Sequence, residues 1–417
     1  MAYLAPAMRI IAFTALLASL LTGCVSTGPL VTQRPQPAQP AVPAPPTGQS
    51  APALPTPLPP PPATPRAGPA PIPPAYPAET EGRGKIMRLL PANAPDRAGW
   101  AADIFSAFAT LHLPLTTENL CSAIAVIEQE SSFQADPVVP GLPRIVWSEI
   151  EKRRQKYLIP KLLLDAAFLK RSPDGKSYKA RVDALRTERQ MNLLFQDMMA
   201  ELPYGRTLLA GYNPIRTGGP MQVSVDFAEG HTRLKGYPYA VGGSIRNEVF
   251  TRRGGVFFGV AILLDYPAPY TQPVYRFADF NAGRYSSRNA AFQAAVTKLS
   301  KKQLDLDGDL LIYEKGEASP EPSATLNALK PLAPRLGLGR NEIRRDLLLE
   351  KTAGFADTPL YRQVFALADG AGRTPRETLP RIVLKSPKIT RHLTTEWFAK
   401  KVDTRYQTCL NRGRQTG

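Results

Sequence analysis

The 417-residue sequence predicts a mainly α-helical protein with a leader and a proline-rich segment at its N-terminus. Segments with apolar residues at helical spacing dominate from about residue 85 to the end, and runs that alternate with period two are few. Prolines instead gather near the N-terminus, where 20 of the 44 lie between Pro29 and Pro77. The folded part is therefore roughly 330 residues long, enough for one large domain or two smaller ones.

The first 23 residues have the features of a secretory signal. Arg9 precedes an apolar run from Ile10 to Leu20, which is far shorter than the roughly 20 residues that span a bilayer. The run ends in "LTGC", residues 21–24, which resembles the lipobox of bacterial lipoproteins. That resemblance implies cleavage before Cys24, acylation of its sulfur with fatty acids such as palmitate, and acylation of its nitrogen. The alternative is an ordinary signal peptide with a chance cysteine.

Val25 follows the cysteine where an Asp would be expected of a protein kept at the inner membrane. For a lipoprotein of this kind, it implies the outer membrane, facing the periplasm. Residues 24–84 then form a proline-rich linker that cannot bury enough apolar surface to fold, so we expect it to be disordered. Extended at about 3.1 Å per residue, such a spacer reaches on the order of 150 Å.

The composition limits the partners and cofactors. The net charge is +17, but a secreted, membrane-tethered chain rarely meets nucleic acid, so we predict no nucleic-acid partner. A basic face would favour anionic cell walls and membranes, although a solvated mixed surface explains the charge equally well. His112, His231 and His392 are scattered without metal-ligand spacing, so the sequence predicts no metal site and no cofactor.

Two cysteines remain in the folded region. Cys121 and Cys409 make an even pair in an oxidising compartment, so we predict a disulfide between them. The alternative is that Cys121 is a catalytic thiol. It lies nine residues before Glu130, about 13 Å along a helix and half a turn around it, so the two side chains could not act together.

Helical periodicity predicts a series of helices, with a short hairpin near residues 232–243. The expected helices cover residues 97–113, 116–133, 144–158, 159–172, 178–202, 254–267, 288–304, 340–351, 359–372 and 390–412. The segment "DLDGDLL", residues 305–311, has neither the Gly nor the Glu that an EF-hand loop needs, so we interpret it as an acidic turn.

The second of these helices contains two glutamates, Glu128 and Glu130. On a helical wheel that begins at Leu120, Glu130 falls inside the apolar arc and Glu128 falls just outside it. We therefore predict that Glu130 points inward. Burial raises the pKa of a carboxyl group, which suits a general acid at neutral pH, but a buried structural ion pair explains the position as well.

Four stretches, in the same order, resemble the soluble lytic transglycosylases, whose fold is related to goose-type lysozyme. "EQESSFQADPVV" resembles their Glu-Ser-x-Phe signature, and "GGPMQVS" resembles their Gly-Leu-Met-Gln motif with Pro220 in place of Leu. "FFGVAILLDY" resembles the helix that follows, and "FADFNAG" resembles their Ala-Tyr-Asn-Ala-Gly motif. The pattern also resembles an uncharacterised group of Gram-negative lipoproteins.

The resemblance implies a lysozyme-like catalytic domain over residues 85–303 with Glu130 as the catalytic acid. Because the Met-Gln motif comes 91 residues after Glu130 rather than about twenty, a helical insertion is expected over about 143–217. A helical C-terminal region, 304–417, is expected to pack on the catalytic domain. The resemblance implies that Ser131 supports the glutamate and that the remaining motif residues contact the substrate: Met221, Gln222, Phe280 and Asn281.

The predicted activity is that of a membrane-anchored peptidoglycan lytic transglycosylase, which cleaves the MurNAc–GlcNAc bond to a 1,6-anhydro product. We find no second carboxylate at a matching motif, which fits a reaction in which one glutamate serves as acid and base. The family's tyrosine, which contacts the catalytic carboxyl, is Phe280 here, unless Tyr275 or Tyr285 supplies a hydroxyl. This departure favours a second reading, a non-catalytic wall-binding protein. A third, a lysozyme-type hydrolase, needs a further acid such as Asp136 or Asp226.

Overall fold

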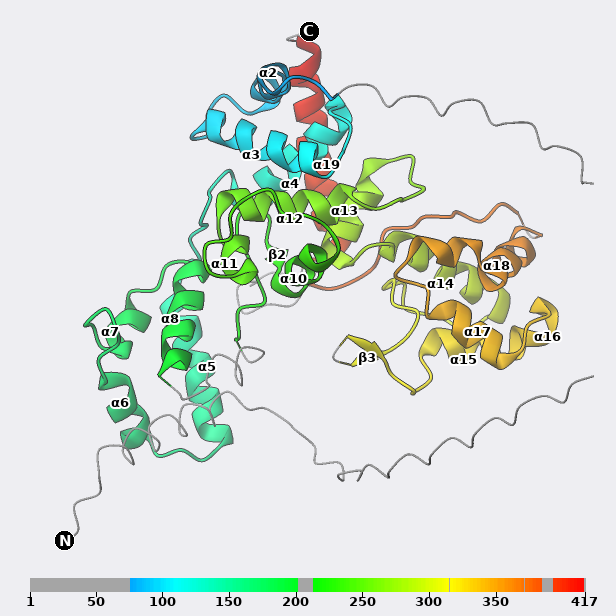
Figure 1. Ribbon diagram of the computed structural model, residues 1–417. Helices are drawn as coiled ribbons and strands as arrows, with labels where there is room; N and C mark the ends of the chain where they lie inside the picture. Colours follow the sequence, from blue (N-terminus) through cyan, green and yellow to red (C-terminus); the bar gives the residue numbers. More distant parts are fainter. Residues whose placement is uncertain (1–75, 202–212, 315, 371, 385–392, 416–417) are drawn as a thin grey trace, which may run out of the picture. The chain divides into compact units, whose positions relative to one another are not determined.

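The chain is mainly α-helical, as predicted (Figure 1). The computed structural model describes residues 76–201, 213–314, 316–370, 372–384 and 393–415. The signal segment 1–23, the predicted lipid site Cys24 and most of the predicted linker lie outside these ranges. Within them, the strands form two antiparallel hairpins of two residues per strand, β1–β2 and β3–β4.

Three separate hydrophobic clusters organise the described residues from Pro77 onward, which form one compact unit. We call them the glutamate lobe, the insertion and the second lobe. The glutamate lobe contains α2 (Glu79–Leu89), α3 (Arg97–Thr110), α4 (Thr117–Ser131), α10 (Val225–Leu234), α11 (Ile245–Val249), α12 (Arg252–Leu264), α13 (Pro273–Ala282), α19 (Thr395–Gln415) and the hairpin β1 (Thr217–Gly218)–β2 (Val223–Ser224).

Helix α4 lies at the centre of the glutamate lobe. Thr116 caps its start by accepting a hydrogen bond from the amide of Asn119 at 3.1 Å. Every residue from Leu120 to Ile127 is buried, because α2, α12 and α19 all pack against the helix. Covered on several sides, α4 is a central helix and not an amphipathic surface helix.

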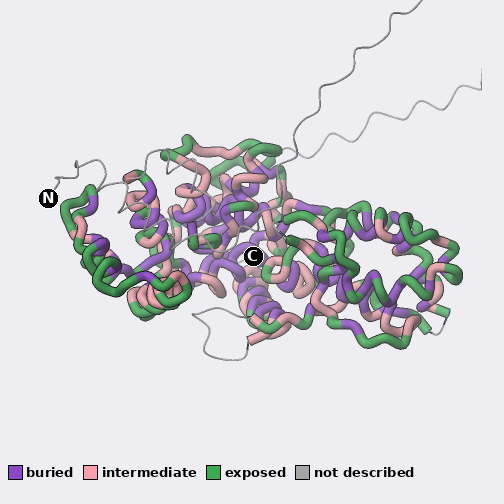
Figure 2. Tube along the Cα trace, turned by 90° about the horizontal axis from the view of Figure 1, so that it is seen from below, coloured by how far each residue is buried: buried purple, intermediate pink, exposed green. Residues whose placement is uncertain are grey.

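The insertion consists of α5 (Leu142–Lys156), α6 (Lys161–Leu169), α7 (Tyr178–Asp183) and α8 (Glu188–Ala200), with a hydrophobic cluster of its own. The single helix expected over 178–202 is therefore two helices. Thr187 separates them, because it forms a capping box with Gln190 that starts α8. Buried and exposed positions alternate along these helices, as the tube coloured by burial shows (Figure 2).

The second lobe comprises α14 (Ser286–Ser300), β3 (Tyr313–Glu314), β4 (Glu317–Ala318), α15 (Ala324–Leu329), α16 (Ala333–Leu336), α17 (Arg340–Leu347) and α18 (Pro359–Asp369), with short 3-10 turns at Lys330–Leu332 and Ala353–Asp357. The two hydrophobic clusters do not divide at the predicted boundary, residues 303/304. Helix α14 precedes that boundary but packs in the second lobe, and α19 follows it but packs against α4 and α13.

Three further expectations need correction or detail. The fold begins with α2 at Glu79, inside the predicted linker, whose end at residue 84 is thus too late. Residues 235–244 form loop and turns and not a hairpin. The "DLDGDLL" segment is a turn fixed to α14, since the Gln293 side chain accepts a hydrogen bond from the Gly308 amide at 2.9 Å and donates one to Asp307 at 2.7 Å.

Among the described residues, no helix is long and apolar enough to span a membrane.

Candidate active site

Glu130 occupies the last turn of α4 and is half-buried. The helix ends abruptly behind it, because Ser132 (φ 49°, ψ 43°) and Phe133 (φ 61°) are both left-handed. Two consecutive non-glycine residues with positive φ are costly, and such strain is typically stored at functional sites. The strained turn is held by the buried side chain of Phe133, whose ring lies edge-on to the ring of Trp100 with a centroid distance of 5.4 Å.

The helical wheel predicted only part of the burial at this end of α4. Glu128 is half-buried too, and among the described residues its Oε2 atom is buried without a hydrogen-bond partner. Burial lowers the pKa of Arg412 on α19, and the charge of Glu128 opposes that shift. A second helix therefore covers the Glu128 side, which a wheel with one buried face cannot represent.

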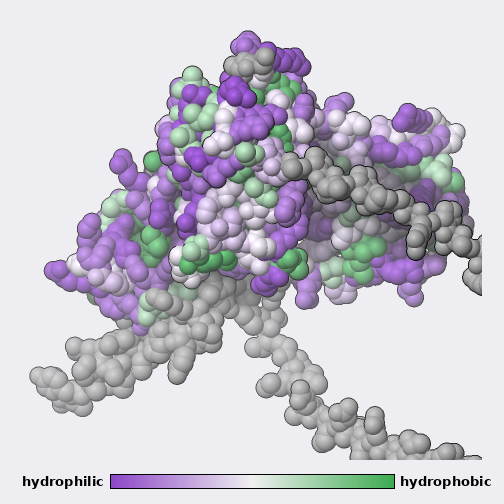
Figure 3. Space-filling view, turned by 45° about the horizontal axis from the view of Figure 1, so that its top comes forward, coloured by the Kyte–Doolittle hydropathy of each residue, from purple (hydrophilic) through white to green (hydrophobic). Residues whose placement is uncertain are grey.

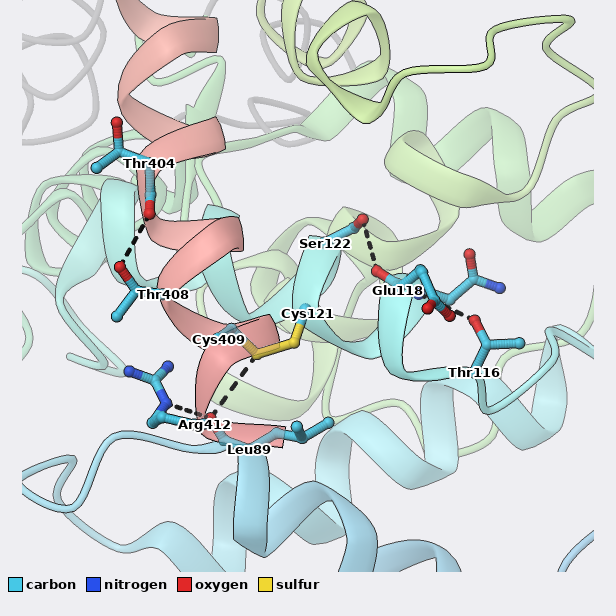
Figure 4. Close-up of a disulfide and its surroundings, with 10 residues drawn as sticks. Leu89, Thr116, Glu118, Cys121, Ser122, Thr404, Thr408, Cys409 and Arg412 are labelled. Atoms are coloured by element: carbon cyan, nitrogen blue, oxygen red, sulfur yellow. Dashed lines mark hydrogen bonds between the residues drawn. A yellow bond between two sulfur atoms is a disulfide. The ribbon is translucent and has the colours of Figure 1, made fainter. Parts of the chain in front are cut away.

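The predicted disulfide is confirmed: Cys121 on α4 and Cys409 on α19 are bonded, with Cα atoms 5.5 Å apart (Figure 4). Next to it, the Nε of Arg412 donates to the carbonyl of Leu89 at 2.9 Å, which ties α19 to the end of α2 as well. Cys121 is thus a structural residue. The crosslink fixes the helix that carries Glu130 to the C-terminal helix.

Ser131 is buried, and its hydroxyl donates to the carbonyl of Ile127 one turn earlier, at 3.0 Å. Its proton is committed to the backbone of α4 and little of its surface is accessible, so a direct role for its hydroxyl beside Glu130 stays a prediction. The serine belongs to the packing of the helix end.

The Met-Gln motif forms the turn between β1 and β2. Gly219 has φ 72°, and a Cβ there would lie 2.1 Å from the carbonyl oxygen of Val249, so only glycine fits. Met221 is fully buried against Gly259 of α12, where an added Cβ would lie 2.3 Å from its sulfur. The prediction that Met221 lines a subsite is therefore wrong, since it is a core residue that anchors the turn. The next residue, Gln222, is half-buried and left-handed, with φ 50°.

A chain of side-chain contacts links Gln222 to the segment after Glu130. The Gln222 Nε2 atom donates to Glu188 Oε2 at 3.0 Å, and Glu188 is the first residue of α8. The preceding Thr187 donates its hydroxyl proton to Asp136 Oδ2 at 3.0 Å. Burial raises the pKa of Asp136, and the hydrogen bond from Thr187 opposes that rise. The start of α8 therefore joins the loop after α4 to the Met-Gln turn.

The sequence analysis missed Glu188. It is a buried carboxylate, but in the sequence it reads as an ordinary acidic residue in the first turn of a helix. The other acid considered there, Asp226, is exposed and lies 3.9 Å from Arg216 at the nearest atoms. Of the two candidate second acids, only Asp136 is thus connected to the motif residues by hydrogen bonds.

The third motif lies at the end of α13. Phe280 is half-buried and packs on the core of the glutamate lobe. Asn281 is exposed, and its side-chain oxygen accepts a hydrogen bond from Thr395 at the start of α19, at 3.0 Å. The aromatic ring of Tyr285 packs near Tyr266 and that of Tyr275 near Tyr270. That one of these tyrosines supplies a hydroxyl at Glu130 stays a prediction.

The aspartate of this motif, Asp279, is fully buried and holds the junction between α13 and α14. It accepts hydrogen bonds from the amides of Ser287 (2.7 Å) and Tyr285 (2.8 Å) and from the hydroxyls of Tyr270 (2.7 Å) and Tyr266 (3.1 Å). Burial raises the pKa of Asp279, and these hydrogen bonds oppose the rise. Its role is structural, because every one of these donors is a neighbour in the fold.

Helix α12 joins the three motifs. It packs against α4, which carries Glu130, against β2, which follows Gln222, and against α13, which carries Phe280 and Asn281. Its core-facing residues are almost all buried, so it forms a rigid floor for the three elements. Three of the four matching stretches therefore belong to elements that pack on the helix containing the fourth.

One cavity of about 350 Å³ lies in the insertion, and its lining contains none of the predicted site residues. Apolar side chains of α5, α6, α7 and α8 line most of it, together with residues 214–217. Glu188 connects this cavity to the Met-Gln turn, because it lines the cavity and also accepts a hydrogen bond from Gln222. Among the described residues, no group of three or more His, Cys, Asp or Glu side chains is arranged to hold a metal ion.

Comparison with known proteins places the chain in a family. Residues 93–412, which include α3 to α18 and most of α19, match the family described as "Protein of unknown function (DUF1615)". The chain belongs to the DUF1615 family. The DUF1615 region contains Glu130, the Met-Gln turn, the third motif and both disulfide cysteines.

A relative from Escherichia coli (strain K12), "Uncharacterized protein YaiW", is 51% identical over 327 residues, which is 78% of this chain and 88% of that protein. No solved structure matches the chain.

Proposed function

We propose that this DUF1615 protein is a peptidoglycan lytic transglycosylase, with Glu130 as the single catalytic acid and base. Its substrate is the glycan strand of alternating N-acetylglucosamine and N-acetylmuramic acid. The proposal includes a lipid anchor at Cys24 in the outer membrane, with the folded region facing the periplasm. We also propose that the glutamate lobe has a lysozyme-like fold.

One observation carries the proposal: the elements of all three motifs pack on α12, and two of them have strained, non-glycine backbone beside the functional residue. Ser132 and Phe133 are left-handed behind Glu130, and Gln222 is itself left-handed. A fold spends stability on such residues where side chains must be held in one orientation. A half-buried carboxyl and an oriented amide are the groups that protonate a glycosidic oxygen and bind acetamido groups.

In the proposed reaction, Glu130 donates its proton to the glycosidic oxygen while the bond from that oxygen to C1 of the muramoyl residue breaks. The substrate's own N-acetyl group stabilises the positive charge at C1. The Glu130 carboxylate then takes the proton of the muramoyl C6 hydroxyl, whose oxygen bonds to C1. The proton removed from the hydroxyl restores Glu130, and a 1,6-anhydro end forms without water.

In this proposal Gln222 accepts a hydrogen bond from the sugar through its carbonyl oxygen, because its NH₂ group already donates within the fold. Asn281 donates to the sugar through its NH₂ group, because its oxygen accepts from Thr395. Glu188 acts as a positioning residue. It engages the NH₂ group of Gln222 at 3.0 Å and so orients the carbonyl oxygen of that amide for a donor on the glycan.

A second candidate is a non-catalytic peptidoglycan-binding protein of the same fold. Phe280 favours it, since this side chain has no hydroxyl and packs on the core. The half-buried carboxyl of Glu130 and the strained turn behind it favour catalysis, since binding to the glycan alone requires neither.

Digestion of purified sacculi separates the candidates. We expect the chain from Val25 onward to release muropeptides that end in 1,6-anhydro-muramic acid, and Glu130→Gln to lose the release while its circular dichroism stays unchanged. Glu118→Gln, an exposed change at the start of the same helix, is the matched control and should keep full activity. Binding to sacculi without any release would favour the non-catalytic candidate, and reducing ends would indicate a hydrolase.

A further inference from the structure

The corner between α5 and α6 of the insertion exposes leucines without a partner among the described residues. Leu158, Leu162, Leu163 and Leu169 are 88%, 79%, 50% and 65% exposed, and we call them the leucine corner. The face of the molecule drawn in Figure 3 is mostly hydrophilic, with small apolar patches. We propose that the leucine corner inserts into the surface of an anionic lipid bilayer.

Helix α6, "KLLLDAAFL", is apolar on two opposite sides. Leu164, Ala167 and Phe168 face the core of the insertion and are buried. Leu162, Ala166 and Leu169 are spaced at i, i+4 and i+7 on the other side and are exposed. A surface helix normally has a polar outer face, so a helix with a second, exposed apolar side has a second apolar environment to enter.

Leu158 is the most exposed leucine of the leucine corner, and its backbone conformation makes a leucine unexpected there. The amide of Ile159 donates to the carbonyl of Arg154 and the amide of Leu158 to that of Gln155, which is the hydrogen-bond pattern of a Schellman motif. Leu158 therefore occupies the C′ position with φ 51°, where glycine is the favoured residue. Both the backbone strain and the exposure of the side chain disfavour leucine in a protein surrounded only by water.

The corner is also rigid. Besides the Schellman bonds, the Arg154 guanidinium donates to the carbonyl of Ile159 at 2.9 Å, and Pro160 precedes α6 and limits its backbone. Leu158 is thus held outward by the fold, and its exposure is not the result of a loose loop.

The charges around the leucine corner favour an anionic membrane as its binding partner. Residues 149–171 contain seven Lys or Arg against three Asp or Glu, a net charge of +4. The three acids pair with Lys152, Arg154 and Lys161 at 2.6–2.7 Å, and Lys170 pairs with Glu201 outside this stretch. Three positive charges remain in excess. Exposed aliphatic side chains surrounded by lysines and arginines are typical of helices that lie in the headgroup region of anionic membranes.

The aromatic residue Tyr157 favours a membrane over a protein as the binding partner. Tyr157 lies beside Leu158, and the ammonium of Lys156 lies 5.5 Å from its ring centre. Tyrosine is enriched at membrane interfaces, and lysine keeps its charge in the headgroup layer while its methylene chain lies deeper. The inference is independent of the proposed activity. Together with the lipid anchor proposed at Cys24, it would supply a second membrane contact.

Vesicle flotation tests the proposal with the chain from Val25 onward, which lacks the predicted lipid. We expect binding to phosphatidylcholine vesicles that contain phosphatidylglycerol, with little binding to pure phosphatidylcholine. Each basic residue near an anionic surface is worth about 1 kcal/mol, so Lys156→Gln should weaken binding roughly fivefold.

Leu158→Gly is the decisive variant, because glycine suits the C′ position. Its urea midpoint should be equal to or higher than that of the wild type, while vesicle binding falls at least tenfold, since full burial of a leucine is worth roughly 1.5–3 kcal/mol. Leu234→Ser is the matched control, an 87% exposed leucine at the end of α10, and should bind like the wild type.

Three results would overturn the proposal. The wild type does not float with anionic vesicles, or Leu158→Gly floats as well as the wild type. In the third, sedimentation reveals a dimer that Leu158→Gly dissolves, in which case the corner binds a second copy of the chain.

Discussion

Removal of the Cys121–Cys409 disulfide tests how α19 is held to α4. The two cysteines are 288 residues apart in the sequence, so the crosslink closes a loop that includes almost the whole folded region. Loop-closure entropy for this length predicts a stabilisation of about 5–6 kcal/mol at 25 °C. Because residual structure in the unfolded chain reduces such values, we expect a measured loss of about 2–5 kcal/mol.

The perturbation is the double variant Cys121→Ala, Cys409→Ala, which leaves no lone thiol. Urea unfolding followed by circular dichroism gives its free energy of unfolding relative to the oxidised wild type. Both cysteines are fully buried, so the double variant also loses packing. Wild type unfolded in the presence of a reductant is the control, since it keeps both sulfur atoms and loses only the bond.

The reduced wild type should lose most of the stability that the double variant loses. If the reduced and oxidised proteins unfold with free energies within about 0.5 kcal/mol, the entropic reasoning is refuted. The packing of Phe398, Val402 and Tyr406 would then hold α19 without the crosslink.

Two further changes test the packing around the site. Gly259→Ala places a Cβ 2.3 Å from the Met221 sulfur and 2.7 Å from its Cβ, so it should destabilise the protein by about 1–3 kcal/mol. Adding Met221→Ala should recover part of that loss in a double-mutant cycle, and strict additivity would contradict the contact. In the second lobe, burial raises the pKa of Glu350 to about 7, above its ordinary value of 4.5. Because the folded-state pKa is the higher one, the stabilisation is complete below pH 4.5 and is lost as the pH rises through 7. Glu350 should therefore make the wild type about 2–3 kcal/mol less stable at pH 8 than at pH 4.5. Glu350→Gln should flatten that difference in urea midpoints, and an unchanged pH dependence would exclude Glu350 as its source.

Local sequence signals predicted much of the fold because most helices have one clear periodicity and recognisable ends. Thr116 and Pro114 mark the start of α4, and the apolar spacing of α3 and α12 needs no long-range information. The break at Thr187 was readable too, since Thr-x-x-Gln is a capping-box pattern.

The remaining features depend on contacts between distant segments. The wheel could not reveal that α19, some 280 residues later, covers the Glu128 side of α4. Met221 carries a family motif, but its burial depends on Gly259 of another helix. Glu188 became a site residue only because the insertion brings the start of α8 to Gln222.

The central claim is that Glu130 transfers protons within the glycan without water. Digestion of sacculi in ¹⁸O-water, followed by mass spectrometry of the new muramic ends, tests it most directly. Our account predicts ends that are one water lighter and carry no label, and none above background from Glu130→Gln. Labelled reducing ends, or unlabelled anhydro ends that Glu130→Gln produces at the wild-type rate, would contradict it.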